Sequence, residues 1–290
     1  MSTSDIYVSM NIEIYQTFHK QFPRNSKCNW ITPVAVGSYS ESGMVKDNTG
    51  DNIAQLNPQF GEFTTMYWAW KNRSLPDVVG FYHYRRYLHL DAHDENFTWE
   101  GKIDKGTHYQ VNISDQPHVL DLMTSDSYLG KLESMFESTE AIMGYPMRFP
   151  VTVPQQWAQH HPMDSLIAFV QELTKQYPTR SAEINYFFSQ YGQIHWPIVI
   201  MRKQVFQNFC EQMFPLLFAI FNRIGTPYDA YQNRYVCFLV ERFIPMWLWL
   251  ERINPRCVPT MTFFTNDIPL VPGQIINKNA PKIAKTQAAF

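Results

Sequence analysis

Strand-like and helix-like patterns of apolar residues alternate in the first part of the chain. Residues 6–10 and 78–82 are short runs of β-branched and aromatic side chains, which predict buried strands. Residues 62–72 carry apolar side chains at helical spacing, and Asn57 followed by Pro58 is typical of a helix start. We therefore expect an α/β unit in this part of the chain.

The pattern changes to longer helices after residue 154. Pro215 and Pro245 are expected to kink or divide the last two of these helices. The pattern therefore predicts a mainly helical part that follows the α/β unit. The elements that it predicts from residue 118 on are a helix or turn at 118–122, strands at 140–145 and 197–201, and helices at 163–177, 181–191, 204–224 and 228–250.

Composition and missing motifs restrict the class of protein. The 290 residues include 17% charged and 16% aromatic residues, which indicates a well-packed body with aromatic-lined clefts. A formal net charge of −2 without a basic stripe gives no reason to expect nucleic acid as a partner. The Rossmann glycine fingerprint and the P-loop pattern are absent, which disfavours NAD, FAD and P-loop kinase chemistry. The four cysteines lack CxxC spacing, so we expect reduced thiols, with Cys210 and Cys237 buried.

Neither a secretory signal nor a membrane span is predicted. The N-terminus lacks the charged and apolar regions of a signal peptide. The apolar stretch 213–221 is too short to cross a bilayer, and 236–250 is interrupted by charged residues and a proline. We expect a cytoplasmic protein, and contact with the inner face of the plasma membrane is an alternative for its basic tail.

The most informative segment is residues 77–87, DVVGFYHYRRY. A predicted buried strand ends here in a polar cluster of His83, Arg85 and Arg86. Ligands of open α/β sheets bind outside the carboxyl ends of the strands, and two guanidinium groups suit a diphosphate. The alternative is a surface arginine pair whose aliphatic stems pack on the neighbouring tyrosines.

A loop rich in Asp, Asn and Gly precedes this strand at residues 47–53. Asp51 and Asn52 are candidates for holding the hydroxyl groups of a nucleotide or sugar. Alternatively, they cap a turn, since Asp and Asn side chains bond readily to the local backbone.

These motifs in this order resemble the family catalogued as domain of unknown function 4422. Members of that family occur in capsular and exopolysaccharide gene clusters and are regarded as glycosyltransferases of the GT-A class. The resemblance implies an α/β fold, a GT-A-like nucleotide-sugar-binding sandwich with a helical C-terminal acceptor region. It rests on DNTGDNI, Asn57-Pro58 with Glu62, YWAWKN, VGFYHYRRY, and the segments 159–161, 195–206 and 229–242, in a stretch that spans residues 5–250.

The resemblance implies one continuous domain over residues 1–255. Residues 1–150 would form its nucleotide-sugar-binding part and 151–255 its helical acceptor part, and 256–290 a C-terminal extension with a loose tail. Two positions depart from the family pattern. The chain continues with Ser-Met-Asn-Ile at 9–12 where a Thr-His-Lys-like segment is usual, and it has Gly61 in place of Cys or a similar residue.

The resemblance also implies a donor site at the end of the predicted strand. Many GT-A enzymes hold a divalent metal ion there with a DxD motif, whereas imidazole and guanidinium groups would repel such an ion. We therefore expect cationic side chains in place of the metal, and Asp91 and Asp94 in the following loop leave Mg²⁺ or Mn²⁺ as an alternative. The implied donor and diphosphate contacts are His83, Arg85, Arg86, Asp51, Asn52 and Glu62.

His161 and Asp229 are the candidates for the base that deprotonates the acceptor hydroxyl. A histidine accepts protons near pH 7, and several GT-A enzymes use an acidic residue near the start of a late helix. The alternatives are a structural histidine and a helix-terminal charge. Glu241 and Arg242 are expected to form a partly buried pair, or else to face the cleft. The candidates for acceptor contacts are His160, His195 and Arg234.

We therefore expect a transferase that moves a hexose from a nucleotide sugar to a growing polysaccharide. The expected donor is UDP-galactose or UDP-galactofuranose, the acceptor a capsular, exo- or lipopolysaccharide or a lipid-linked oligosaccharide, and the resemblance implies inversion. The main alternative is a non-catalytic carbohydrate-binding or scaffold protein of a polysaccharide assembly complex. A phosphate-ester hydrolase is disfavoured, because neither clustered metal-ligand acids nor a nucleophile motif is present.

Overall fold

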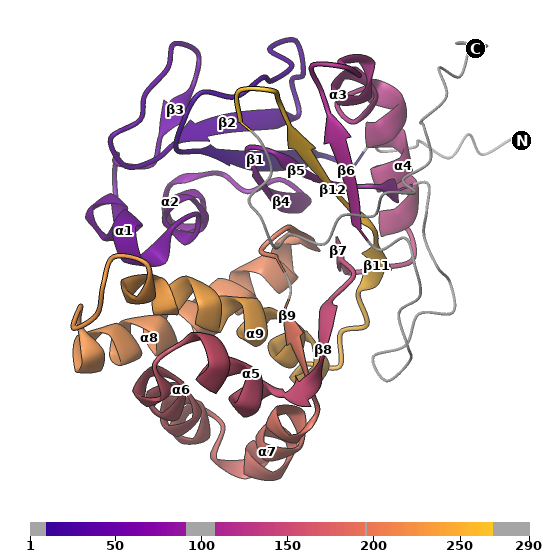
Figure 1. Ribbon diagram of the computed structural model, residues 1–290. Helices are drawn as coiled ribbons and strands as arrows, with labels where there is room; N and C mark the ends of the chain where they lie inside the picture. Colours follow the sequence, from indigo (N-terminus) through magenta and orange to yellow (C-terminus); the bar gives the residue numbers. More distant parts are fainter. Residues whose placement is uncertain (1–9, 91–107, 195, 269–290) are drawn as a thin grey trace, which may run out of the picture.

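The structure, a computed structural model, describes residues 10–90, 108–194 and 196–268. Within them, a mixed sheet of ten strands runs through the molecule (Figure 1). Its strands are β1 (Ile12–Phe18), β2 (Ile31–Ala35), β3 (Val45–Lys46), β4 (Val78–His83), β5 (Arg86–Leu88), β6 (His108–Asn112), β7 (Ala141–Gly144), β10 (Val199–Arg202), β11 (Arg256–Val258) and β12 (Thr260–Phe264). The main path follows the order β11-β7-β10-β4-β1-β2-β3, and β12 pairs with β5 and β6 beside it. A separate antiparallel pair is formed by β8 (Met147–Thr152) and β9 (Tyr191–Ile194).

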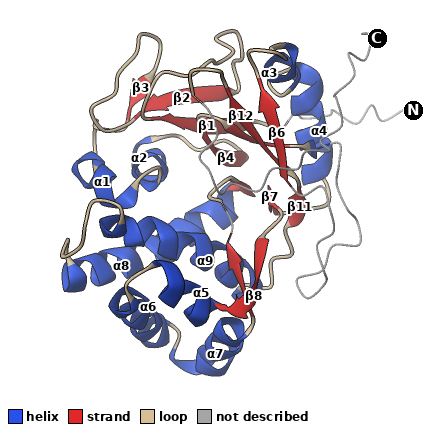
Figure 2. Ribbon diagram, in the orientation of Figure 1, coloured by secondary structure: helices blue, strands red, loops and turns tan. Residues whose placement is uncertain are grey.

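Helices cover both faces of the main sheet (Figure 2). They are α1 (Asn57–Phe60), α2 (Phe63–Asn72), α3 (His118–Leu122), α4 (Asp126–Phe136), α5 (Val153–His160), α6 (Met163–Gln176), α7 (Ser181–Ser189), α8 (Lys203–Ile224) and α9 (Tyr235–Leu250). In the part of the chain that the structure describes, the 3₁₀ turns η1 (Ala54–Leu56), η3 (Pro178–Arg180) and η4 (Gln232–Arg234) each precede a helix. The side chains of α2, α8 and α9 pack on one face of the sheet, and those of α3 and α4 on the other.

Alternate residues of the central strands belong to the two cores. In β4, Val79 and Phe81 pack on the side of α8 and α9, whereas Val78 and Tyr82 pack on the side of α4. This follows from the two-residue period of a strand, whose successive side chains point to opposite faces. Because both faces are covered, the strand is apolar throughout, and its sequence predicted a buried strand for that reason.

The parallel strands β1 and β4 end at the same edge of the sheet. Their register aligns Thr17 with His83. The residues that follow the two strands meet there as well, since the rings of His19 and Tyr84 lie 4.9 Å apart in an edge-to-face arrangement. This edge is where the polar cluster predicted from the sequence emerges.

The first strand lies further along the chain than the sequence predicted. β1 covers Ile12–Phe18, and residues 6–9 lie outside the described residues. The strand therefore runs into Thr17-Phe18-His19-Lys20, a Thr-His-Lys-like segment, so the departure expected at residues 9–12 was wrong. Residues 12–18 mix polar with apolar side chains, and pairing with β2 and β4 on either side makes them a strand.

The second half of the chain contributes strands to the same sheet. β10 lies between β4 and β7 and pairs antiparallel with both. Residues 256–264 form β11 and β12, whose Val258, Met261 and Phe263 are buried, so their assignment to an extension was wrong. These two short apolar runs lie in a part of the sequence that is rich in proline and asparagine, so no strand was predicted there. The predicted loose tail lies outside the described residues.

Two helix boundaries differ from the predicted ones, and two predicted breaks are absent from the described helices. Gly61, with φ of 52°, separates α1 from α2 in what the sequence predicted as one helical segment. The last helix begins at Tyr235 rather than at residue 228, after the turn η4. Pro215 and Pro245 lie inside α8 and α9 without dividing either helix, because both helices are held by their buried faces. Helix α4 was not predicted.

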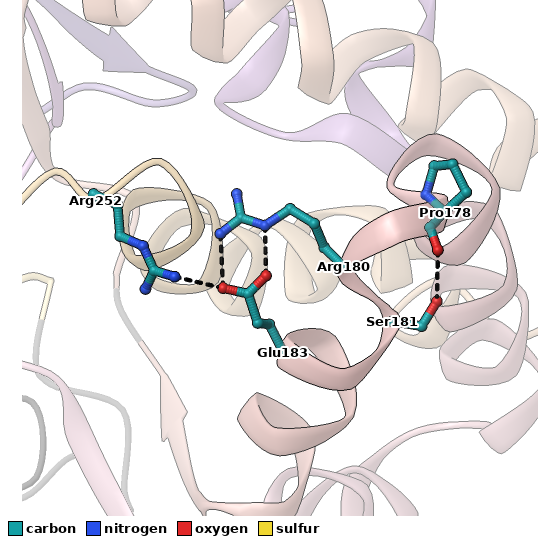
Figure 3. A network of polar contacts seen from close by, with 5 residues as sticks. All are labelled: Pro178, Arg180, Ser181, Glu183 and Arg252. Carbon is teal, nitrogen blue, oxygen red and sulfur yellow. Dashed lines mark hydrogen bonds and ion pairs between the residues drawn. The ribbon is translucent and has the colours of Figure 1, made fainter.

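A network of ion pairs joins the end of α9 to the start of α7 (Figure 3). The Glu183 carboxylate accepts hydrogen bonds from Arg180 Nε and Nη2, at 2.6 and 2.9 Å. Arg252 Nη2 donates to the same carboxylate at 2.6 Å. Arg180 and Arg252 are therefore arginines whose charge is satisfied within the fold.

The four cysteines, all within the described residues, are not joined in disulfides, and Cys210 and Cys237 are buried as predicted. Across the ranges that the structure describes, the helices are too short or too polar to cross a membrane.

Candidate functional site

A cavity of about 560 Å³ lies at the edge of the sheet where β1 and β4 end. Its lining comes from the ends of these strands, from the turn between α1 and α2, from Trp196 and Pro197, and from one face of η4 and α9. Its volume is within the range of small-ligand sites. The ionisable residues that line it are His19, Lys20, Glu62, His83, Tyr84, Arg85, Arg86, Arg234, Cys237 and Glu241.

Arg85 and Arg86 are cations without an acidic partner among the described residues. Arg85 is only 7% exposed and Arg86 is half-buried. Neither side chain forms an ion pair or hydrogen bond with a described residue, and each guanidinium Nε is buried without a partner. Arg242, by contrast, is fully buried and pairs with Glu241. Because burying an unpaired charge is costly, Arg85 and Arg86 are arranged for an anion that enters the cavity.

The summed charge of the side chains that line the cavity is positive, whereas the net charge of the whole chain is negative. Four basic side chains, Lys20, Arg85, Arg86 and Arg234, face two acidic ones, Glu62 and Glu241. The formal local charge is therefore +2, whereas the whole chain carries −2. The cavity attracts a small anion although the protein as a whole is slightly acidic.

Aromatic rings orient the two arginines. The guanidinium carbon of Arg86 lies 4.6 Å from the centroid of the Trp196 ring, within the range of a cation–π contact. The corresponding distance from Arg85 to the ring of Tyr84 is 5.6 Å. These contacts restrict the guanidinium groups without neutralising them, so less order has to be imposed when an anion binds.

Both histidines of the cavity are neutral at pH 7. Burial lowers the pKa of His83 well below its ordinary value, and the charges of Arg86 and Arg85 lower it further. Desolvation also lowers the pKa of His19, which is more exposed than His83. His83 Nδ1 is buried without a partner. The two imidazoles therefore offer hydrogen bonds to a ligand and add no charge.

Glu241 lies on the face of α9 that lines the cavity. Burial raises the pKa of its carboxyl group to about 7, although Arg242 opposes the shift. Glu241 Oε2 accepts a hydrogen bond from Arg242 Nη1 at 3.0 Å. Arg242 in turn donates to the Phe238 carbonyl oxygen at 2.6 Å and to Gln156 Oε1 at 2.7 Å. The carboxylate is therefore held in one place on the cavity wall and titrates near neutral pH.

The structure brings together about half of the site residues that the sequence predicted. His160 is exposed at the end of α5 and does not line the cavity, and His195 lies outside the described residues. The predicted residues that line the cavity are His83, Arg85, Arg86, Glu62 and Arg234, and those that do not are Asp51, Asn52, His160, His161 and Asp229.

Asp51 and Asn52 stabilise a turn away from the cavity. Tyr67 donates its hydroxyl hydrogen to Asp51 Oδ1 at 3.1 Å. Asn52 Nδ2 donates to the Gly50 carbonyl oxygen at 2.9 Å, and Asn52 Oδ1 accepts from the Ala54 backbone N–H at 3.2 Å. This is the capped turn that the sequence left open as the alternative.

Asp229 and His161 also have partners within the fold. Asp229 Oδ1 accepts hydrogen bonds from the backbone N–H groups of Tyr231 and Gln232, both at 2.9 Å, and so caps the turn η4. His161 Nδ1 lies 3.1 Å from Gln232 Oε1, and its ring stacks on Phe238 with 4.3 Å between centroids. Asp229 is also exposed to solvent, and neither residue lines the cavity.

Sequence reasoning missed His19 and Lys20 and left the orientation of Glu241 open. His19 and Lys20 follow β1 directly, so the correct position of that strand would have placed them beside His83. Arg234 and Glu241 are seven residues apart, the spacing of two helical turns. A helix that starts next to Arg234 therefore puts both side chains on one face, and the sequence contains that signal.

The side chains present do not fit a divalent cation in the cavity. Among the described residues, no three His, Cys, Asp or Glu side chains gather closely enough to hold a metal ion. The cavity presents Glu62 and Glu241 together with four cationic side chains, whereas Mg²⁺ and Mn²⁺ take sets of oxygen ligands. Asp91 and Asp94, the alternative metal ligands in the sequence, lie outside the described residues.

The described site is thus a cationic cavity at the carboxyl ends of strands in an α/β sheet, the usual place for a ligand in such folds. The family model described as Domain of unknown function (DUF4422) matches residues 13–252, so the chain belongs to this family. It is also similar in structure to the bifunctional glycosyltransferase WbbM in its apo form, with a TM-score of 0.71 and 23% sequence identity. The match covers 91% of this chain and 47% of WbbM, so the chain spans about half the length of that protein. No curated protein matches this chain. The predicted α/β, GT-A-like fold is confirmed.

Proposed function

We propose that this protein is a glycosyltransferase whose nucleoside diphosphate sugar binds in the cavity. The observation that carries the proposal is the pair Arg85 and Arg86, two buried or half-buried guanidinium groups without an acidic partner among the described residues. A diphosphate presents several charged oxygens, which guanidinium groups bind through paired hydrogen bonds. The fold shared with a glycosyltransferase supports the same conclusion.

In this proposal the arginines stabilise the leaving group. Negative charge grows on the diphosphate as its bond to the sugar breaks, and oriented cations in a partly desolvated site lower the energy of that state. Lys20 and Arg234 extend the positive charge along the cavity, and His83 is a neutral hydrogen-bonding group beside it. These side chains take the place of a metal ion at the end of β4.

The family resemblance suggests the substrates. We propose UDP-galactose or UDP-galactofuranose as the donor and a capsular, exo- or lipopolysaccharide, or its lipid-linked precursor, as the acceptor. Inversion at the anomeric carbon is part of the proposal. The rings of Trp196 and Phe238 line the cavity and offer apolar faces to a sugar. A lipid-linked acceptor would bring the enzyme to the inner face of the plasma membrane.

Calorimetric titration with UDP in the presence of EDTA tests the proposal. The proteins compared are the wild type, Arg85→Ala and the matched control Arg223→Ala. Arg223 is an exposed arginine on α8 that donates a hydrogen bond to Gln171, so its loss removes the same charge outside the cavity. We expect the wild type and Arg223→Ala to bind UDP equally, and Arg85→Ala to bind about 10- to 100-fold more weakly.

Two results would contradict the proposal. Binding of UDP only in the presence of Mn²⁺ would show that a metal ion, and not the arginine pair, holds the diphosphate. If UDP binds under neither condition, the non-catalytic carbohydrate-binding protein becomes the better explanation.

A further inference from the structure

Two carboxylates, Glu62 and Glu241, line the cavity among the residues that the structure describes. Glycosyl transfer needs a group that takes the proton of the acceptor hydroxyl as the new bond forms. The imidazoles of His19 and His83 are weak bases, because burial lowers the pKa of each. Burial also raises the pKa of the Cys237 thiol, which therefore stays protonated. The choice of base is thus between the two glutamates.

Glu241 is the glutamate whose position is fixed. Its Oε2 accepts a hydrogen bond from Arg242, which is itself buried and anchored to Gln156. Its Oε1 accepts no hydrogen bond from a described residue and is not fully enclosed, so this oxygen is available to a ligand. The Glu62 side chain lies near the charges of Arg86 and Arg234 but forms no hydrogen bond with a described residue, so its carboxylate is less firmly oriented than that of Glu241.

The position of Glu241 also suits the direction of the reaction. Glu241 comes from α9, whereas Arg85 and Arg86 come from the turn after β4 and the start of β5, and all three residues line the same cavity. A donor whose diphosphate rests on the arginines would present its anomeric carbon to the interior of the cavity. An attacking hydroxyl group beside Glu241 would then reach that carbon from a different wall than the leaving group.

We propose that Glu241 is the catalytic base of the transfer, an inference that rests on the function proposed above. Oε1 takes the proton of the acceptor hydroxyl while the hydroxyl oxygen forms a bond to the anomeric carbon. The bond from that carbon to the diphosphate oxygen breaks, and its electron pair leaves with the diphosphate. Glu241 then returns the proton to water.

The charged groups around Glu241 come from several elements. They are Arg242 on α9, Glu62 before α2, Arg86 on β5 and Arg234 on η4. Burial is the largest influence and raises the pKa of Glu241 to about 7; Glu62 adds to the shift, and the three arginines oppose it. A base must be deprotonated to act, so the rate is expected to fall about tenfold for each pH unit below this value.

The test follows UDP release from UDP-galactose, UDP-galactofuranose and UDP-glucose, with water or an alkyl galactoside as the acceptor. Glu241→Gln keeps the shape and the hydrogen bond to Arg242, and Glu211→Gln on the exposed face of α8 is the matched control. We expect kcat of Glu241→Gln to fall more than tenfold, typically by about 10²–10⁴-fold, while the Kd for UDP stays within about threefold. The residual rate of Glu241→Gln should not fall as the pH is lowered below 7, in contrast to that of the wild type. Glu211→Gln should match the wild type in kcat and in the Kd for UDP.

The possible failures are distinguishable. If kcat of Glu241→Gln falls less than tenfold, the base assignment is wrong while the proposed transferase stands. A joint loss of UDP binding and turnover would also overturn the assignment, because it indicates a structural role. If the wild type binds UDP but releases none from any donor, or binds no UDP, the proposed function fails and the assignment of the base fails with it.

Discussion

The guanidinium group of Arg86 lies over the indole ring of Trp196, with 4.6 Å between the guanidinium carbon and the ring centroid. Arg86 opens β5, and Trp196 precedes β10, so the contact joins segments that are distant in sequence. Among the described residues Arg86 has no acidic partner. The ring therefore orients a cation whose charge remains free for a ligand.

Removal of this ring should weaken anion binding. We expect Trp196→Ala to raise the Kd for UDP about 2- to 30-fold, because a cation–π contact contributes about 0.5–2 kcal/mol and its loss releases the Arg86 side chain. Trp249→Ala is the control, since Trp249 makes a similar contact with Arg252 at 5.7 Å and does not line the cavity. Equal UDP affinities of the wild type and Trp196→Ala in calorimetry would show that the ring does not orient Arg86.

Ionisation of Glu241 should make stability depend on pH. Its pKa is raised in the fold from 4.5 to about 7, so the native state holds this proton more tightly than the unfolded chain. The group therefore stabilises the fold below pH 4.5, and this contribution is lost as pH rises to about 7. Relative to the wild type, Glu241→Gln should gain up to about 3 kcal/mol of unfolding free energy between pH 5 and pH 8. Urea unfolding at the two pH values measures this, and parallel pH dependence of the two proteins would contradict it.

The backbone at Gly61 places the turn between α1 and α2 against α9. Its φ is 52°, and a Cβ atom at this position would lie 2.9 Å from Cys237 Sγ. Gly61→Ala should therefore lower the free energy of unfolding by about 2–4 kcal/mol, through backbone strain and through this overlap. Urea unfolding would measure the loss.

Gly225 separates the two causes. It has a similar backbone conformation, with φ of 68°, but no atom within 4 Å of the added Cβ. Gly225→Ala should therefore report the backbone strain alone, about 1–3 kcal/mol. In a Cys237→Ala background, Gly61→Ala should cost the same as Gly225→Ala. If the cost of Gly61→Ala is unchanged in that background, the Cys237 side chain is not what opposes it.

The loop that contains Asp51 should matter for stability and not for donor binding. Asn72 Oδ1 accepts from the Asp51 backbone N–H at 2.9 Å, and Asn72 Nδ2 donates to the Asp51 carbonyl oxygen at 2.7 Å. We expect Asn72→Ala to cost about 1–2 kcal/mol of unfolding free energy and Asp51→Ala less than about 1 kcal/mol. Both variants should bind UDP within about twofold of the wild type. A large loss of UDP affinity in Asp51→Ala would contradict this and would show that the loop belongs to the donor site, as the sequence predicted.

Much of the fold could be predicted because it depends on local patterns. The apolar run of β4 and the periodicity of α6, α7 and α8 identified these elements to within a few residues. Strand β1 was missed because its residues mix polar with apolar side chains, and the strand predicted at residues 6–10 lies mostly outside the described residues. Strands β11 and β12 were missed because short strands are stabilised by pairing partners far away in the sequence.

The sequence by itself determined the α/β class, the family and the cationic composition of the site, since these follow from periodicity and from the order of short motifs. Only the tertiary structure decided which acidic residues meet the arginines. The Asp229 carboxylate accepts hydrogen bonds from backbone N–H groups of its own turn, as short acidic side chains often do, and the Asp51 carboxylate accepts one from the Tyr67 hydroxyl. Glu241 reaches the cavity because α9 packs against the sheet with this face toward the ends of β1 and β4. That orientation depends on how the buried side of the helix fits the core, which the sequence of the helix alone does not specify.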